Sequence, residues 1–211
     1  MHKKPDSRAF EGFTPDCICN GERRKQGESM IDKKEIWENI KYIAIGIIFA
    51  VALNKGMGLI LHTDLPIVAV MSGSMVHDAT TPYRHYQFLE ENFNYSKEEI
   101  DSWQIKNGFR PGDVLIIKGI PQDELKVGDV IVFTYEVQPV PIIHRIIYID
   151  EKGYPFTKGD HNPVMDPDCN LNQGTVCWKR TDIKGKAVLW VPWLGLPKLI
   201  LFNIIAFLRG G

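Results

Sequence analysis

An apolar run near the N-terminus constrains the fold of this chain most strongly. Residues 42–53 contain no charge, and the apolar pattern resumes after a short polar interruption that includes Lys55. A helix needs about 20 mostly apolar residues to cross a bilayer, so residues 36–61 are long enough if the Lys55 amine reaches the surface. The segment is apolar around its whole circumference, which favours a transmembrane anchor over the alternative, a buried helix of a soluble protein.

Basic residues gather before this anchor. Residues 1–35 form a polar tail without the apolar stretch of a signal peptide. Between residues 42 and 84 the only basic residue is Lys55, whereas the chain before residue 42 contains Arg23, Arg24, Lys25, Lys33, Lys34 and Lys41. The positive-inside rule therefore predicts a cytoplasmic tail, with the chain after the anchor on the extracytoplasmic side.

A second apolar segment covers residues 188–209 and is interrupted by Pro192, Pro197 and Lys198. It is predicted to be a second membrane anchor, which either spans the bilayer or lies at the interface. In the interfacial arrangement Trp190 and Trp193 would lie at the depth of the headgroups.

The composition of the whole chain is that of a globular protein. Among 211 residues, 44% are hydrophobic, and 25 basic residues against 26 acidic ones give a net charge of −1. This balance does not supply the basic surface that nucleic-acid binding requires, so no nucleic acid partner is expected.

Residues 62–187 are predicted to form a mainly β domain of the α+β class. Short β-branched runs are bounded by Gly, Pro and Asp at 66–71, 114–117, 130–134, 142–149 and 186–191. Residues 76–110 break the pattern and predict a helical insert. Within it, Ser96 and Glu99 form a capping box that opens a helix through about Asn107.

Three groups of residues are candidates for catalysis, and the first is Ser72-Gly73-Ser74-Met75, directly after a predicted strand. Small residues leave the Ser74 hydroxyl exposed and let a substrate backbone approach closely. A serine is a weak nucleophile until a base takes its proton, and the alternative is an ordinary turn.

His144 is the best candidate for that base. Strand alternation places it on one face with Ile142, Ile146 and Tyr148, and places Arg145 on the opposite face. The alternative is a histidine that is simply part of the core.

The third group is the acidic loop that contains Asp160 and Asp166. Two carboxylates in one loop can orient an imidazole or bind a cation. The loop lacks the spacing and the terminal Glu of a calcium-binding loop, so no metal is expected.

Together these motifs resemble the type I signal peptidases of the archaeal and endoplasmic-reticulum type. The resemblance extends from the first anchor to about Pro197 and is interrupted by the insert. The matching segments, in order, are Ser72–Met75, Gly128–Phe133, His144-Arg145, Thr157–Asn162 with Asp166, and Gly185–Gly195. The histidine stands where bacterial members have a lysine.

The resemblance implies a signal-peptidase-like β catalytic domain on a membrane anchor. Ser74 is the implied nucleophile and His144 the implied general base. The oxyanion would be bound by the backbone N–H of Ser74 and the hydroxyl of Ser72. Asp166 would orient His144 and Asp160 would hold the loop, although the reverse assignment stays open.

The implied reaction is removal of N-terminal signal peptides and needs no cofactor. The implied substrates are secretory preproteins with small residues before the cleavage site, bound as an extended strand. Membrane lipid and the translocation machinery are the other expected partners. The expected location is the cell membrane, or the endoplasmic reticulum membrane in a eukaryote, with the site on the extracytoplasmic face.

The pattern departs from the family at His77, where a proline is usual, and in the length of the insert. One alternative function is a Ser-Lys peptidase with Lys118 or Lys158 as base. A polar turn around Lys158 would not lower the pKa of its amine. The other alternative is an inactive, membrane-anchored subunit that binds substrates.

The topology divides the four cysteines between the two sides of the membrane. Cys17 and Cys19 lie in the cytoplasmic tail and should stay reduced. Cys169 and Cys177 lie outside, where a disulfide between them is predicted and two free thiols are the alternative.

Overall fold

The computed structural model describes residues 33–167 and 180–209. The chain divides into two units, residues 1–44 and 45–211. The four cysteines and the predicted disulfide lie outside the described residues.

Helix α1, Lys33–Leu61, contains the predicted anchor and begins three residues before its predicted start. Residues 34–61 are long and apolar enough to cross a membrane, and this stretch is not buried by the rest of the protein. The structure thus has the apolar N-terminal helix that the sequence predicts.

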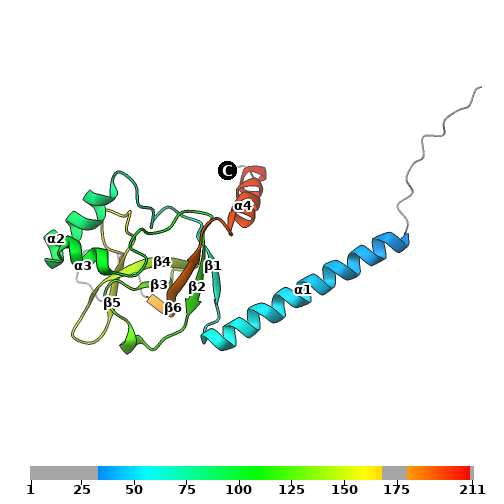
Figure 1. The fold of residues 1–211 in the computed structure, drawn as a ribbon, viewed down its shortest axis with the longest axis horizontal. Coiled ribbons are helices and arrows are strands. Elements are labelled where there is room, and N and C mark those ends of the chain that lie inside the picture. The colour runs from blue at the N-terminus through cyan, green and yellow to red at the C-terminus, as the bar shows by residue number, and fades with distance from the viewer. Residues whose placement is uncertain (1–32, 168–179, 210–211) are drawn as a thin grey trace, which may run out of the picture. The chain divides into compact units, whose positions relative to one another are not determined.

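Within the described residues, six antiparallel strands form one sheet in the order β1-β2-β6-β3-β4-β5 (Figure 1). Their bounds are β1 Ile67–Ala69, β2 Val114–Lys118, β3 Val130–Tyr135, β4 Gln138–Ile149, β5 Pro155–Lys158 and β6 Arg180–Val191. Five of them fall on predicted strands. The sixth, β5, falls where a turn was expected from residue 157; all four of its residues are buried, so it lacks the polar alternation that marks a half-exposed strand.

Strand β3 lies between β6 and β4 and is buried on both faces. Val130 and Val132 belong to one apolar cluster, whereas Ile131 and Phe133 belong to another. Side chains alternate along a strand, so these clusters pack on opposite faces of the sheet.

The same alternation gives neighbouring residues of β4 different surroundings. His144 pairs with Ile131, and Arg145 pairs with Val130. The two side chains therefore point to opposite faces, as the sequence predicts.

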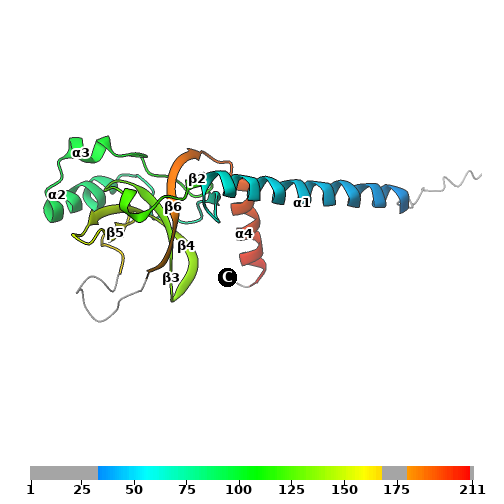
Figure 2. The ribbon, with the colours of Figure 1, turned by 90° about the horizontal axis from the view of Figure 1, so that it is seen from below.

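The insert contains a π-helical turn, Pro82–Gln87, that continues into α2, Phe88–Phe93, followed by α3, Lys97–Ser102. In both views α2 and α3 lie at the opposite side of the sheet from α4 (Figures 1 and 2). The insert packs on the sheet through a cluster of Leu89, Ile100 and Ile147.

The predicted capping bond of α3 is present, since the Ser96 hydroxyl accepts the Glu99 N–H at 3.2 Å. The predicted end at Asn107 is wrong because the helix ends at Ser102. Trp103 turns to an extended conformation, and its ring covers Gly128 so closely that a Cβ there would lie 2.5 Å away. This long-range packing ends the helix.

The C-terminal apolar segment divides between two elements. Its first residues, 188–191, complete β6, and the helix α4, Leu196–Leu208, follows after a turn. The turn is tied to the start of β2, where the Asp113 carboxylate accepts the Trp193 N–H at 3.1 Å and the Gly112 carbonyl accepts the Gly195 N–H at 2.8 Å.

Candidate active site

Ser74 lies in the loop that follows β1. Next to it, Met75 is 1% exposed and belongs to the core, and its carbonyl accepts the Phe109 N–H at 3.0 Å. A bond of 3.1 Å from the Val76 N–H to the Gly73 carbonyl closes the turn around the serine. Met75 therefore fixes the loop while Ser74 stays partly exposed.

The loop after β5 contacts the backbone of this serine. The His161 N–H donates to the Ser74 carbonyl at 2.9 Å. A Cβ at Gly159 would lie 2.7 Å from the same carbonyl oxygen, a distance that real Cβ atoms do not adopt. Glycine at 159 thus permits the close approach of the two loops.

His144 contacts the predicted carboxylate. Its Nδ1 lies 2.7 Å from Oδ2 of Asp166, and both residues are 8% exposed. The Thr157 hydroxyl donates to the same oxygen at 2.7 Å, and the Asp166 N–H donates to the Thr157 carbonyl at 2.9 Å. Asp166 is therefore held in place by its own backbone and by a second donor.

Ser72, Ser74 and His144 line one pocket of about 340 Å³. The rest of its lining comes from residues 68–71, Met75, residues 140–143 and Asn162. The two serine hydroxyls lie 3.2 Å apart, and among the described residues no hydrogen bond joins Ser74 to His144. Such a bond is often long without substrate and shortens when the substrate binds.

Asp160 lies with Arg145 and is fully buried. Nε and one Nη of Arg145 donate to its two oxygens at 2.9 and 2.8 Å, and Nε2 of His77 lies 2.9 Å from Oδ2. Burial alone would raise the pKa of this carboxyl, but the Arg145 charge and the hydrogen bonds outweigh it and hold the pKa well below its usual range. Asp160 is ionised at neutral pH.

Arg145 also connects the insert to the sheet. Its remaining N–H groups donate at 2.9 Å to the carbonyls of Gln104, Ile105 and Gly128. The side chain is fully buried, and every donor of its guanidinium has a partner. The pair with Asp160 therefore links β4, the insert and the loop after β5.

Comparison with curated proteins finds similarity to catalytic subunits of the signal peptidase complex. The signal peptidase complex catalytic subunit SEC11C of Homo sapiens is 25% identical over 175 residues, which cover 81% of this chain and 75% of that protein. The catalytic subunit SEC11 of Scheffersomyces stipitis is 25% identical over 175 residues, 81% of this chain and 87% of that protein. The chain is a homologue of signal peptidase catalytic subunits.

No family model matches the chain. The relatives confirm the predicted resemblance to type I signal peptidases of the archaeal and endoplasmic-reticulum type. The predicted fold class is also confirmed: an α+β domain built on an antiparallel sheet, with an apolar N-terminal helix and a helical insert.

The prediction that Lys158 lies in a polar turn is wrong. This residue ends β5 and is 1% exposed, and its amine donates to the Gly159 carbonyl at 3.0 Å and lies over the Phe88 ring. Burial lowers the pKa of the Lys158 amine to about 8, against the opposing effect of the Asp160 charge. Because Lys158 pairs with Arg145 across the strands, its side chain points to the face opposite His144. The other candidate lysine, Lys118, is exposed at the end of β2.

Sequence reasoning missed two neighbours of these groups. Thr157 was part of the acidic motif, but its bond to Asp166 depends on the loop returning beside β5. His85 lies in the insert, for which no site residue was predicted, yet it is 2% exposed and its Nδ1 lies 3.5 Å from Oδ1 of Asp160. Burial lowers the pKa of the His85 imidazole to about 4.

Proposed function

We propose that the chain is a membrane-bound serine endopeptidase that removes N-terminal signal peptides from secretory precursors. The observation that carries the proposal is a buried His144–Asp166 pair whose imidazole lines the same pocket as a partly exposed serine, Ser74. The names of the relatives, catalytic subunits of the signal peptidase complex, support the choice of substrate.

In the proposed mechanism the Ser74 oxygen attacks the scissile carbonyl and its proton passes to Nε2 of His144. The Asp166 carboxylate accepts the Nδ1–H and stabilises the imidazolium. His144 then gives its proton to the departing amine of the mature protein. Water, deprotonated by the same imidazole, hydrolyses the ester and restores the Ser74 hydroxyl.

The oxyanion would lie between the N–H of Ser74 and the hydroxyl of Ser72. The hydroxyls of the two residues lie 3.2 Å apart, so both can reach one substrate carbonyl. Loss of one such donor raises the barrier by about 2.7–4 kcal/mol in well-studied hydrolases.

The substrate would bind as an extended strand between β1 and β4. Residues 68–71 line one side of the pocket, and residues 140–143 line the other. Among the described strands β1 pairs only with β2, so its second edge is available to a peptide backbone. The preference for small side chains near the scissile bond is the one that the resemblance to signal peptidases implies.

Membrane attachment would come from α1 as a spanning helix. The basic residues before it favour a cytoplasmic N-terminal tail, so the active site would lie on the extracytoplasmic face. There it would meet precursors that leave the translocation machinery, with their apolar segment already in the lipid.

A Ser-Lys peptidase is the second candidate because the pKa of Lys158 is lowered to about 8. The direction of its side chain weighs against it, since Lys158 shares a face with Arg145 while His144 lines the serine pocket. An inactive binding subunit is less compatible with a serine and a paired histidine in one pocket.

The test is cleavage of a secretory precursor by the full chain in lipid vesicles, with the product identified by mass spectrometry. The expected product is a mature protein whose N-terminus follows a small residue. A precursor that stays intact, or that is cut at unrelated sites, would overturn the proposed function.

A further inference from the structure

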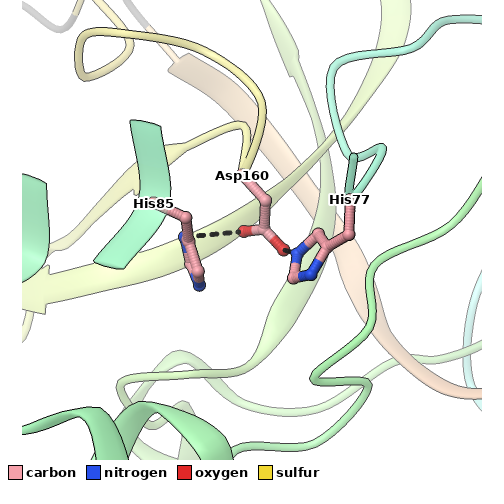
Figure 3. A group of neighbouring side chains, drawn as sticks. All are labelled: His77, His85 and Asp160. Carbon is pink, nitrogen blue, oxygen red and sulfur yellow. Dashed lines mark hydrogen bonds and ion pairs between the residues drawn. The ribbon is translucent and has the colours of Figure 1, made fainter. Parts of the chain in front are cut away.

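Three donor side chains converge behind the catalytic loop, on residues that the proposed mechanism does not use. His77 follows the serine loop, His85 belongs to the π-helical turn of the insert, and Asp160 belongs to the loop after β5 (Figure 3). One nitrogen from each histidine and one carboxylate oxygen all lie within 4.8 Å of one another.

The second notable feature of this cluster is the histidine nitrogen on the insert side. Nδ1 of His85 is buried without a hydrogen-bond partner among the described residues, although it faces Oδ1 of Asp160 at 3.5 Å. A buried polar atom without a partner is uncommon in folded proteins and calls for an explanation. Figure 3 shows the Asp160 carboxylate between the two imidazoles, each aimed at a different oxygen.

We propose that His77, His85 and Asp160 bind a divalent transition metal of the zinc class. Zinc takes imidazole nitrogen and carboxylate oxygen at about 2.0–2.2 Å, so neighbouring donors lie about 2.9–3.4 Å apart for bond angles between 90° and 109°. Nε2 of His77 lies 2.9 Å from Oδ2 of Asp160 and Nδ1 of His85 lies 3.5 Å from Oδ1, so each histidine is close to that range from one carboxylate oxygen. Nitrogen donors disfavour Mg²⁺ and Ca²⁺.

Arg145 is compatible with this site. It donates two hydrogen bonds to Asp160, and carboxylates that bind metals commonly receive such bonds from outside the coordination sphere. Nε2 of His77 would bind the metal instead of contacting Oδ2 of Asp160. The proton of the His77 imidazole would then be on Nδ1. The His77 side chain is 16% exposed, which leaves a route for the ion and a position for water as a fourth ligand.

The metal would have a structural role. It would join three segments that are distant in the sequence: the chain after Ser74, the insert, and the loop that carries Asp160 and Asp166.

The experiment is thermal unfolding of the full chain in detergent, treated with EDTA and then titrated with Zn²⁺. The test variant is His85→Phe, because the Tyr86 and Trp103 rings contact the imidazole edge-on and a phenyl ring keeps that packing. The matched control is His62→Asn, which removes an exposed histidine at a left-handed position, φ 54°, that asparagine tolerates.

Zinc should raise the unfolding temperature of the wild type and of His62→Asn, and His85→Phe should lose that shift. Without zinc, His85→Phe should be at least as stable as the wild type because it removes a buried nitrogen without a partner. Equal zinc shifts in the wild type and His85→Phe would overturn the proposal.

A second measurement tests the proposal even if His85→Phe fails to fold. Co²⁺ added to the wild type should give visible absorption of a low-coordinate nitrogen and oxygen site, and His77→Gln should weaken Co²⁺ binding at least tenfold. Cysteine ligands elsewhere would contribute equally to both proteins, so the difference isolates this site. Identical Co²⁺ spectra in both proteins would contradict the proposal, whatever the outcome for precursor cleavage.

Discussion

Asp160 and Asp166 lie six residues apart in one loop and contact different partners. Asp166 contacts the imidazole of His144, whereas Asp160 neutralises the fully buried Arg145. A carboxylate that orients an imidazole affects the reaction rate, and one that compensates a buried cation affects stability. Substitution by asparagine separates these effects because the amide keeps the shape and removes the charge.

Asp166→Asn should lower the cleavage rate by about 10⁴ while the unfolding temperature stays close to that of the wild type. Asp160→Asn should instead cost about 3–5 kcal/mol of stability, since it leaves Arg145 buried without its counter-charge. Cleavage kinetics and thermal unfolding of both variants provide the measurement. A folded but inactive Asp160→Asn beside a fully active Asp166→Asn would reverse the assignment.

The buried amine of Lys158 predicts how the stability of the protein depends on pH. Burial lowers the pKa of its amine from 10.5 to about 8, so between those values the unfolded chain binds more protons than the folded one. Stability from this group therefore rises as the pH rises from about 8 to 10.5, by about 3 kcal/mol. Lys158→Met should remove that rise in the unfolding temperature and leave cleavage unchanged. Loss of cleavage in a folded Lys158→Met would favour the Ser-Lys alternative.

Gly159→Ala should impair catalysis. The new Cβ would lie 2.7 Å from the Ser74 carbonyl and 2.8 Å from the Asn162 amide, so the serine loop must move. A shift of about 1 Å at a nucleophile can cost about 10² in rate. The control is Gly46→Ala, where nothing lies within 4 Å of the new Cβ. Wild-type kcat/KM in Gly159→Ala would contradict the close contact of the two loops.

At the scale of helices and strands, local patterns predict elements better than their ends. The Ser96 capping bond is local and was predicted, whereas the end of α3 depends on Trp103 meeting Gly128 from another part of the chain. Strand β5 has no alternation because it is buried on both faces. The partners of His77 and His85 depend on how the insert packs, which spacing alone does not encode.

The length of α4 predicts its place in the membrane. Its 13 residues extend about 20 Å, which is short of the roughly 30 Å hydrocarbon core of a bilayer. We therefore expect α4 to lie at the interface, with residue 209 on the same side as the catalytic domain. Arg209→Cys in a cysteine-free background should react with an impermeant maleimide added from that side. Labelling only from the cytoplasmic side would show that the segment spans.

At the scale of the whole molecule, the two faces of β4 hold the proposed catalytic residues and the buried ion pair apart. The His144 face of β4 lines the pocket with the serines, and the Arg145 face holds Asp160 against the insert. The sequence predicted Ser74, His144 and Asp166 because their motifs are local and ordered. It did not predict the cluster around Asp160, because that cluster joins residues up to 83 positions apart.

The cleavage rate of Ser74→Ala tests the central claim most directly. The full chain in lipid vesicles should cleave a secretory precursor, and Ser74→Ala should lower the rate by about 10⁶ while it inserts and unfolds like the wild type. The matched control is Ser102→Ala, an exposed serine of α3 that should keep the wild-type rate. Cleavage by Ser74→Ala at the wild-type rate would contradict the assignment of Ser74 as the nucleophile.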